Sequence, residues 1–328
     1  MIYKLQPTRV YRAYYGGYNL DMMQNVNPPE ISRFPEDWLA SVTIAYNPGR
    51  EVKNEGLSKT DDGQILKTLI EANKEKMIGK RSEMSLLFKL LDSSERLAIQ
   101  VHPTVDFAKK YFNSPYGKTE CWYMLNDGGE VYLGFKEGIT KEYWKSLFES
   151  QDTEAMLECM HKFSVKKGDF IFVEGGVPHA IGKNCFLAEL QEPTDLMVIP
   201  EKVTPSGIEL PDQKLHCGLG FEKMFDCFEY NGMSKEETYS KYFIKPKKTD
   251  SNIEVLADSS ITDKFRLFRI KVNGSASFVT DSYAVAVAVY GSAEINSTKL
   301  VTGDRIFISE NENNLNINGN AEILICMP

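Results

Sequence analysis

The chain has 328 residues, of which 42% are hydrophobic and 26% charged, and its formal net charge is -8. This length and composition are typical of a globular protein with two domains, or one large domain and an appendage. The negative charge and the lack of a basic stripe argue against a nucleic-acid partner. The longest uncharged apolar tract, Tyr283–Tyr290, is far shorter than the ~20 residues that a membrane helix needs.

The start of the chain and its cysteines both bear on its location. Met1–Pro7 has no basic segment followed by an apolar core, so we do not expect a secretory signal. The six cysteines are scattered and none forms a Cys-x-x-Cys pair, which is typical of reduced thiols. We therefore predict a cytoplasmic protein without a membrane partner, while its oligomeric state stays open.

The first half of the chain mixes predicted strands and helices. Residues 153–161 are expected to form a charged helix that leaves His161 facing solvent. Two helices open at threonines that can cap them. In chain order we predict a β-like run at 41–45, a helix at 64–77, strands at 85–91 and 97–101, a short helix at 103–111, a strand at 130–135, and helices at 140–150 and 153–161.

The second half becomes almost entirely β. Strands are predicted at 168–173 and 185–190, and polar-flanked helices at 221–228 and 235–242. Past a lysine-rich break at 245–252, alternating apolar residues and Asn, Gly and Asp turns indicate strands only. We therefore predict two domains. The first, residues 1–240, would be a catalytic metal-binding domain with helical insertions, and the second, residues 241–328, a small β domain.

A short internal repeat supports this division. The sequence of Gly168–Val173, GDFIFV, recurs as GDRIFI at Gly303–Ile308. In both, Gly-Asp can form a tight turn before an apolar strand, which suggests two copies of one jelly-roll unit. The last histidine of the chain is His216, so the C-terminal copy is predicted to be metal-free.

Two distant segments each supply half of a candidate metal site. Gln100 and His102 are two residues apart in an apolar run, so in a strand both side chains point to one face. Glu120 and His179 lie on or beside further runs of this kind. Two imidazoles, a carboxylate and an amide oxygen suit a divalent ion such as zinc. The alternative is that the histidines are structural, because ligand patterns spread over ~80 residues are weak signals.

Further polar residues lie near these segments in the sequence. Glu189 and Gln191 share a face of the next predicted strand, and a carboxylate near a metal in a dry barrel is a candidate general acid or base. The commoner alternative for a single glutamate is a solvent-facing edge. Lys118 lies two residues before Glu120 and points the same way in an extended segment. It could hold a phosphate or assist proton transfer.

Three segments, in this order, resemble the type I mannose-6-phosphate isomerases in their short bacterial form. The first joins Leu86–Leu91 to Ala98–Pro103, the second is Gly117–Tyr123, and the third runs from Gly168–Gly182 to Glu189–Asp195. The resemblance implies a mainly β cupin fold with two jelly-roll barrels and helical insertions. It also implies an aldose–ketose isomerase that interconverts mannose 6-phosphate and fructose 6-phosphate through an enediol, so its partner would be a small hexose phosphate.

The resemblance also implies roles for individual residues. Zinc would be bound by Gln100, His102, Glu120 and His179, the same four residues that the spacing suggests. Lys118 and Glu189 match catalytic positions, and Lys89 and Lys118 match positions that face the substrate. These residue roles are the prediction that the structure has to meet.

One departure from the family pattern affects the predicted chemistry. Family members usually carry an arginine at the position of Ile199, four residues beyond the Asp of the Thr194-Asp195 pair. An isoleucine cannot bind phosphate, and Lys183 or Lys202 would have to substitute. The change leaves open a non-catalytic, sugar-phosphate-binding cupin that acts as a sensor. A third alternative is an iron-dependent redox cupin.

Overall fold

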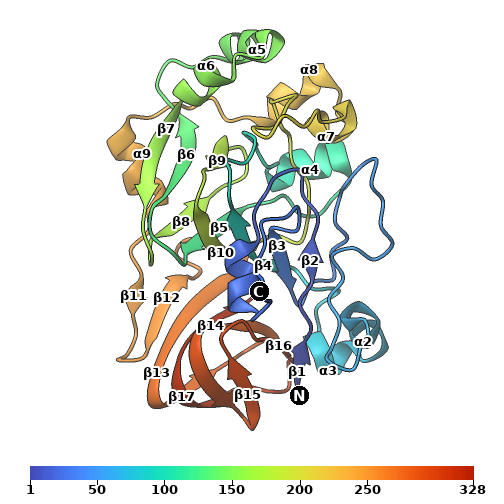
Figure 1. Cartoon of the computed structure of the whole chain (residues 1–328), viewed down its shortest axis with the longest axis vertical. Helices are drawn as coiled ribbons and strands as arrows, with labels where there is room; N and C mark the ends of the chain where they lie inside the picture. Colours follow the sequence, from blue (N-terminus) through green and yellow to red (C-terminus); the bar gives the residue numbers. More distant parts are fainter.

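The computed structural model describes all residues 1–328, and the protein is mainly β with antiparallel strand pairing throughout. Figure 1 shows the sheets stacked along the long axis, with helices at the upper end and along the sides and the C-terminal strands at the lower end. The strands are β1 (Ile2–Leu5), β2 (Arg9–Val10), β3 (Glu36–Leu39), β4 (Leu87–Ser93), β5 (Glu120–Met124), β6 (Gly129–Phe135), β7 (Met160–Val165), β8 (Phe170–Val173), β9 (His179–Ile181), β10 (Cys185–Gln191), β11 (Lys247–Lys248), β12 (Ile253–Ala257), β13 (Arg266–Val279), β14 (Ala284–Ile295), β15 (Thr298–Val301), β16 (Arg305–Ile308) and β17 (Asn314–Met327). The helices are α1 (Tyr18–Met23), α2 (Leu66–Ala72), α3 (Lys74–Ile78), α4 (Val105–Phe112), α5 (Lys141–Ser150), α6 (Thr153–Glu158), α7 (Asp212–His216), α8 (Phe221–Met224), the 3₁₀ helix η1 (Phe225–Cys227) and α9 (Lys235–Tyr242).

The C-terminal strands form an eight-stranded sheet in the order β1-β16-β14-β17-β13-β12-β11, with β15 paired to β14. The first strand of the chain, β1, joins this sheet by pairing with β16. The N-terminus therefore lies beside the C-terminal sheet, next to the red strands at the lower end of Figure 1. This pairing is outside what sequence order suggests, and the division into residues 1–240 and 241–328 stays a prediction.

The middle of the chain forms the sheets that hold the candidate site. A six-stranded sheet has the order β2-β3-β4-β10-β5-β8, and a three-stranded sheet has the order β7-β6-β9. Two isolated bridges tie the segment after β4 to its neighbours: Gln100 pairs with His179 of β9, and Val101 pairs with Val198 in the segment after β10. Helices α5 and α6 cover the upper end of these sheets, and α7 and α8 lie beside them (Figure 1).

Alternation along the strands divides the buried residues between two faces. On β4, Phe88 and Leu90 join a core of 29 buried residues that also contains Val285 and Val287 of β14. This core therefore joins the N-terminal and C-terminal sheets. Lys89, between the two β4 residues, must point to the opposite face, because successive strand residues alternate.

The repeated Gly-Asp motif forms the same turn in both halves of the chain. Gly168 and Gly303 have φ of +90° and +89°, a left-handed conformation that glycine adopts without a steric penalty. The carboxylate of Asp169 accepts a hydrogen bond from the backbone N–H of Lys166 at 3.0 Å, and that of Asp304 accepts from Val301 at 2.8 Å. Strands β8 and β16 follow, so the repeat predicted from six residues extends to the backbone geometry.

Several predicted elements differ from those observed. Residues 41–45 form no strand, and in 97–101 only Gln100 and Val101 form bridges, both of them isolated. The helix predicted at 64–77 is divided at Asn73 into α2 and α3. The prediction for His161 was wrong. Helix α6 ends at Glu158, and His161 lies on β7, buried, with Nε2 2.8 Å from the carbonyl oxygen of Met233. Helix α6 is followed after one residue by β7, whose six residues are too few for their alternation of buried and exposed side chains to stand out in the sequence.

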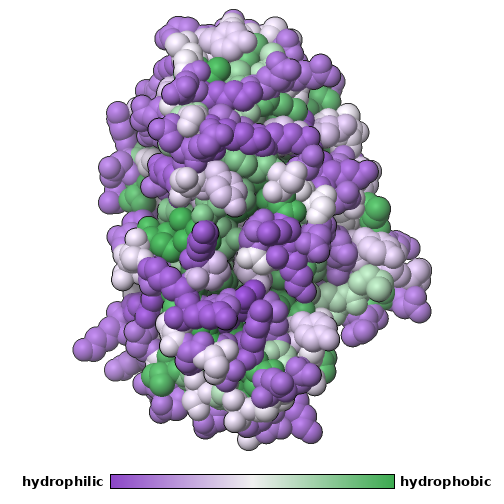
Figure 2. All heavy atoms as spheres, turned by 90° about the vertical axis from the view of Figure 1, so that its left-hand side faces the viewer, coloured by the Kyte–Doolittle hydropathy of each residue, from purple (hydrophilic) through white to green (hydrophobic).

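No helix of the protein is long and apolar enough to cross a membrane. Figure 2 shows a face on which hydrophilic residues predominate and apolar residues lie in scattered patches. All six cysteines are free, as the sequence analysis predicts.

Candidate metal centre and the adjoining cavity

Three neighbouring strands carry charged side chains on the face opposite the large apolar core. The register places Glu189 of β10 opposite Lys89 of β4, and Gln191 of β10 opposite Glu120 of β5. Glu189 and Gln191 are two residues apart, so all four side chains project to the same face of the sheet. All four are buried, which gives this sheet a charged interior.

The structure brings three of the four predicted metal ligands together. One ligand atom each from His102, Glu120 and His179 lies within 4.8 Å of the others. His102 Nε2 is 3.2 Å from Glu120 Oε2, and His179 Nε2 is 3.4 Å from Glu120 Oε1. All three residues are at most 1% exposed. Side chains that are distant in sequence therefore meet at one dry point in the fold.

The hydrogen bonds of this cluster fit a bound divalent metal. Nδ1 of His102 lies 3.0 Å from the carbonyl oxygen of Leu196, and Nδ1 of His179 lies 2.9 Å from that of Val177. A carbonyl can only accept, so the protons lie on Nδ1 and each Nε2 atom carries a lone pair, of which that of His102 faces the Lys118 ammonium at 3.0 Å. Neither His179 Nε2 nor Glu120 Oε2 has a hydrogen-bond partner. Buried polar atoms left without a partner are costly, and a cation at this point would satisfy them.

The protonation states also suit a metal. Burial, together with the nearby Lys118 ammonium, lowers the pKa of His102 to about 3, and burial lowers the pKa of His179 as well. Both rings are therefore neutral at physiological pH, as metal ligands must be. Burial opposes ionisation of Glu120, yet the Lys118 ammonium, 3.6 Å away, holds its pKa well below the usual range. The cluster thus offers two imidazoles and a carboxylate, a donor set that zinc accepts.

Gln100, the fourth predicted ligand, is placed beside this cluster by its backbone. Its N–H donates to the carbonyl of His179 and its carbonyl accepts from the N–H of His179, both at 2.9 Å. Residues that exchange two such bonds lie directly opposite each other with their side chains on the same face. The Gln100 side chain is half-buried and lines the cavity described next. Its role as a metal ligand stays a prediction.

A narrow cavity adjoins the metal cluster and is lined by four cationic side chains. Its wall contains Gln100 and Lys118, and Lys118 Nζ lies 3.0 Å from His102 Nε2. Burial lowers the pKa of Lys118. The complete lining is Arg12, Ala13, Tyr14, Glu36, Asn47, Lys89, Leu91, Leu97, Ala98, Gln100, Lys118, Glu189, Met197, Ile199, Thr204, Leu210 and Lys214.

Glu189 and Lys89 form a buried pair in this wall. Lys89 Nζ is 3.1 Å from Glu189 and 3.6 Å from Glu36. Burial, reinforced by the Glu120 carboxylate, raises the pKa of Glu189 to about 8. A carboxyl group with a pKa close to the working pH can both accept and return a proton. Lys89 already pairs with the carboxylates of Glu189 and Glu36. It is therefore less available to bind a substrate anion than the sequence suggests.

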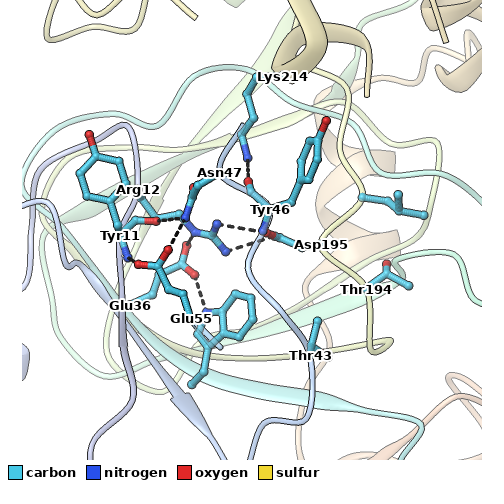
Figure 3. Close-up of polar contacts among 12 residues, drawn as sticks. Tyr11, Arg12, Glu36, Thr43, Tyr46, Asn47, Glu55, Thr194, Asp195 and Lys214 are labelled. Atoms are coloured by element: carbon cyan, nitrogen blue, oxygen red, sulfur yellow. Dashed lines mark hydrogen bonds and ion pairs between the residues drawn. The ribbon is translucent and has the colours of Figure 1, made fainter. Parts of the chain in front are cut away.

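An arginine from the N-terminal segment occupies the other part of the cavity. Arg12 binds Asp195 through two nitrogens, at 3.0 and 3.1 Å, and its Nε is 3.0 Å from Glu36 (Figure 3). Its guanidinium also lies 5.1 Å from the ring centroid of Trp38. All of these groups are buried, and the paired geometry of a guanidinium and a carboxylate fixes both in place.

The two lysines that could substitute for the missing arginine, Lys183 and Lys202, lie outside the cavity. Ile199 is 5% exposed and lines the cavity, whereas Lys183 and Lys202 are exposed and do not. The other two cationic groups of the cavity, Arg12 and Lys214, received no role from the sequence. Arg12 lies in a stretch, Arg12–Gly17, that resembles the family only weakly, and Lys214 lies outside the three family-like segments. Asp195, the last residue of the third segment, is the partner that points toward Arg12.

Comparison with known proteins gives the same family at three levels. Residues 25–133 match the protein family described as "Phosphomannose isomerase type I, catalytic domain". The "Probable mannose-6-phosphate isomerase GmuF" of Bacillus subtilis is 28% identical over 250 residues, which are 74% of this chain and 75% of the relative. The "Mannose-6-phosphate isomerase" of Streptococcus mutans is 37% identical over 118 residues, about a third of each chain.

Solved structures match along the entire chain. The mannose 6-phosphate isomerase of Bacillus subtilis superposes with a TM-score of 0.77 at 20% identity, covering 100% of this chain and 99% of that one. A zinc-bound mannose 6-phosphate isomerase gives 0.75 at 16% identity and covers 99% and 98%. The fold is therefore the mainly β cupin fold predicted from the sequence.

The mainly β fold, the buried histidine–glutamate cluster and these relatives define the class of the protein as an aldose–ketose isomerase. The ligand atoms of the cluster are compatible with zinc. More particularly, residues 25–133 match the catalytic domain of the type I phosphomannose isomerases, and the relatives and solved structures named above are similar to this chain over the same region and beyond it.

Proposed function

We propose that this protein catalyses the interconversion of mannose 6-phosphate and fructose 6-phosphate and that the four predicted side chains bind its zinc ion. The observation that carries the proposal is the pair of partnerless ligand atoms, on His179 and Glu120, next to a cavity that contains a titratable carboxyl group. Gln100 would complete a set of four ligands with His102. The hexose phosphate would lie in the cavity beside Lys118.

The reaction moves one proton from C2 to C1 of the open-chain sugar and a second between the two oxygens. A divalent ion held by these residues would polarise the sugar oxygens and offset the negative charge that develops on them. Glu189 projects into the cavity from rigid β10 and is the group proposed to carry the proton between the carbons. Lys118 is proposed to donate hydrogen bonds to the sugar oxygens, and Lys89 holds Glu189 in place at 3.1 Å.

Burial of the site supports this chemistry. Lys118 and Glu189 are each 2% exposed, so bulk water does not screen the charges that they carry. Arg12 and Asp195 give the same cavity a fixed wall, since their two hydrogen bonds restrain both side chains. A substrate held in such a wall is oriented before any proton moves, which is a large part of a catalytic advantage.

A coupled assay on zinc-loaded protein tests the proposal. We expect mannose 6-phosphate to be converted to fructose 6-phosphate, with much slower turnover of other hexose phosphates. A protein that leaves both sugars unchanged while zinc is bound would contradict it.

The sensor alternative retains one specific observation in its favour, the apolar Ile199 in the cavity wall. It predicts thermal stabilisation by mannose 6-phosphate without turnover. A strong rise in isomerase activity in Ile199→Arg would then identify the cavity as a site that has lost catalysis.

A further inference from the structure

Four cationic side chains line the cavity, and three of them already have carboxylate partners. Arg12 pairs with Asp195 and Glu36, Lys89 with Glu189 and Glu36, and Lys118 lies 3.6 Å from Glu120. The fourth, Lys214, has no carboxylate oxygen within the 4.0 Å that defines an ion pair. It is nevertheless only 8% exposed.

The surroundings of Lys214 leave part of its ammonium unused. Its Nζ donates to the carbonyl oxygen of Tyr46 at 2.6 Å and lies 5.3 Å from the centroid of the Tyr46 ring (Figure 3). No other side-chain hydrogen bond is formed by Lys214. An ammonium has three donors, so two remain for a ligand. A buried cation without a counter-ion is costly to the fold, and such costs are concentrated at functional sites.

Two segments hold Lys214 in this position. Its helix, α7, follows the stretch that carries Ile199, Thr204 and Leu210 into the cavity wall. The Tyr46 backbone that accepts its hydrogen bond is itself fixed, because the Tyr46 N–H donates to Asp195 at 2.8 Å. Asp195 is the residue that holds Arg12, so the Lys214 ammonium is positioned by the same buried network that forms the wall of the cavity.

We propose that Lys214 binds the phosphate group of the substrate and thereby selects a phosphorylated over a neutral sugar. The inference rests on the proposed function, in which a hexose phosphate occupies this cavity. Lys214 then replaces, from a different part of the chain, the cation that Ile199 cannot supply. A phosphate dianion would give the buried ammonium the counter-ion that the protein does not.

The first test measures binding of inorganic phosphate to the zinc-loaded protein by calorimetry and thermal shift. We expect Lys214→Met to weaken phosphate binding by at least about tenfold, since an ammonium–phosphate hydrogen bond is charge-assisted. Lys214→Arg keeps the charge and should retain most of the binding. Lys202→Met removes an exposed lysine outside the cavity and should change nothing.

The second test uses steady-state kinetics. With mannose 6-phosphate, Lys214→Met should raise KM by about 10-fold to 100-fold and change kcat much less, because the phosphate is remote from the reacting carbons. The discrimination between mannose 6-phosphate and mannose should fall by a similar factor. A wild-type protein that does not bind inorganic phosphate, or a Lys214→Met variant that binds it equally well, would overturn the inference.

The pH dependence of phosphate binding adds a readout that a structural role would not produce. Burial lowers the pKa of Lys214 to about 8, opposed by Asp195 and affected to a smaller extent by Arg12, Cys217 and Glu36. Wild-type binding should therefore weaken as pH rises through about 8, while the Lys214→Arg variant should not show this loss. The same weakening in both proteins would contradict the assignment.

The outcomes separate this inference from the proposed function. Phosphate binding that depends on Lys214 in a protein without isomerase activity would support the inference and contradict the proposed reaction. Isomerase activity with an unchanged KM in Lys214→Met would support the proposed reaction and contradict the inference about Lys214.

Discussion

The two sheets that meet at the large apolar core differ in what their other faces bury. Strand β14 of the C-terminal sheet places Ala284, Ala286 and Ala288 in a second cluster of 17 buried residues, all of them hydrophobic. Strands β4, β5 and β10 of the six-stranded sheet instead place Lys89, Glu120 and Glu189 on their second face.

This difference shows that strands of the same antiparallel type contribute to stability in the C-terminal sheet and to chemistry in the six-stranded sheet. The apolar face is satisfied by packing alone, whereas every buried charge needs a partner, a metal or a ligand. The groups left unsatisfied in the charged half include two ligand atoms of the metal cluster, on His179 and Glu120, and the ammonium of Lys214 has no carboxylate partner. The Gly-Asp turn common to β8 and β16 underlines that the backbone of the two halves can be alike while their interiors are not.

The largest effect is expected from His179→Ala, which removes a ligand from the charged half. Isomerase activity should fall by about 10³-fold or more, because the metal is worth several kcal/mol of transition-state stabilisation. Bound zinc, measured by mass spectrometry, should fall below one per chain, and the melting temperature should fall with it. His216→Ala, at the end of α7, serves as the control and should retain zinc. Full zinc occupancy in His179→Ala would refute the ligand assignment.

Glu189→Gln separates proton transfer from metal binding. The amide has nearly the same shape but cannot carry the proton, so kcat should fall by about 10²-fold to 10⁴-fold. Zinc content should stay unchanged, because Glu189 is not among the clustered ligand residues. If kcat stays within a factor of three of the wild type, another group moves the proton.

Arg12→Met tests the buried ion network. It leaves Asp195 and Glu36 without their guanidinium, so the free energy of unfolding should fall by about 3–5 kcal/mol at pH 7. Arg50→Met removes an arginine from a partly exposed pair with Glu55 and should cost at most about 1 kcal/mol. Urea denaturation of both variants measures the difference, and equal losses would contradict the special role of the buried pair.

The Arg12 variant also has a defined pH dependence. Although burial opposes ionisation of Asp195, Arg12 holds its pKa below the usual value. The wild type therefore has this stabilisation above the unfolded-state pKa, near 4, and loses it as pH falls through the folded-state pKa. Without Arg12, burial raises the pKa of Asp195 instead. Lowering the pH from 7 to 4 should therefore reduce the difference in unfolding free energy between the variant and the wild type. If this difference in unfolding free energy instead grows as the pH falls, the predicted direction of the Asp195 pKa shift is wrong.

The smallest effect is expected in the apolar half. Ile323→Val on β17 removes one methylene from the all-hydrophobic cluster and should cost about 0.5–1.5 kcal/mol of unfolding free energy. KM, kcat and zinc content should stay unchanged, since this cluster contains no ligand or charged group. A clear change in zinc content or KM would mean that the two halves are coupled more closely than their interiors suggest.

The sequence by itself determined the features that depend on local pattern. Alternation places Glu189 and Gln191 on one face, and the Gly-Asp repeat predicts a common turn, because side-chain direction and turn geometry are set by neighbours in the chain. The family-like segments add the pairing of His102, Glu120 and His179, which the structure brings within 4.8 Å.

Only the tertiary structure decided the partners of the remaining charges. Arg12 and Asp195 are 183 residues apart, and Lys214 meets the Tyr46 carbonyl across 168 residues. β1 pairs with β16 although they come from opposite ends of the chain. Such contacts depend on how sheets stack and loops close, and the free energy that selects them comes from burying the whole core. No short stretch of sequence carries that information.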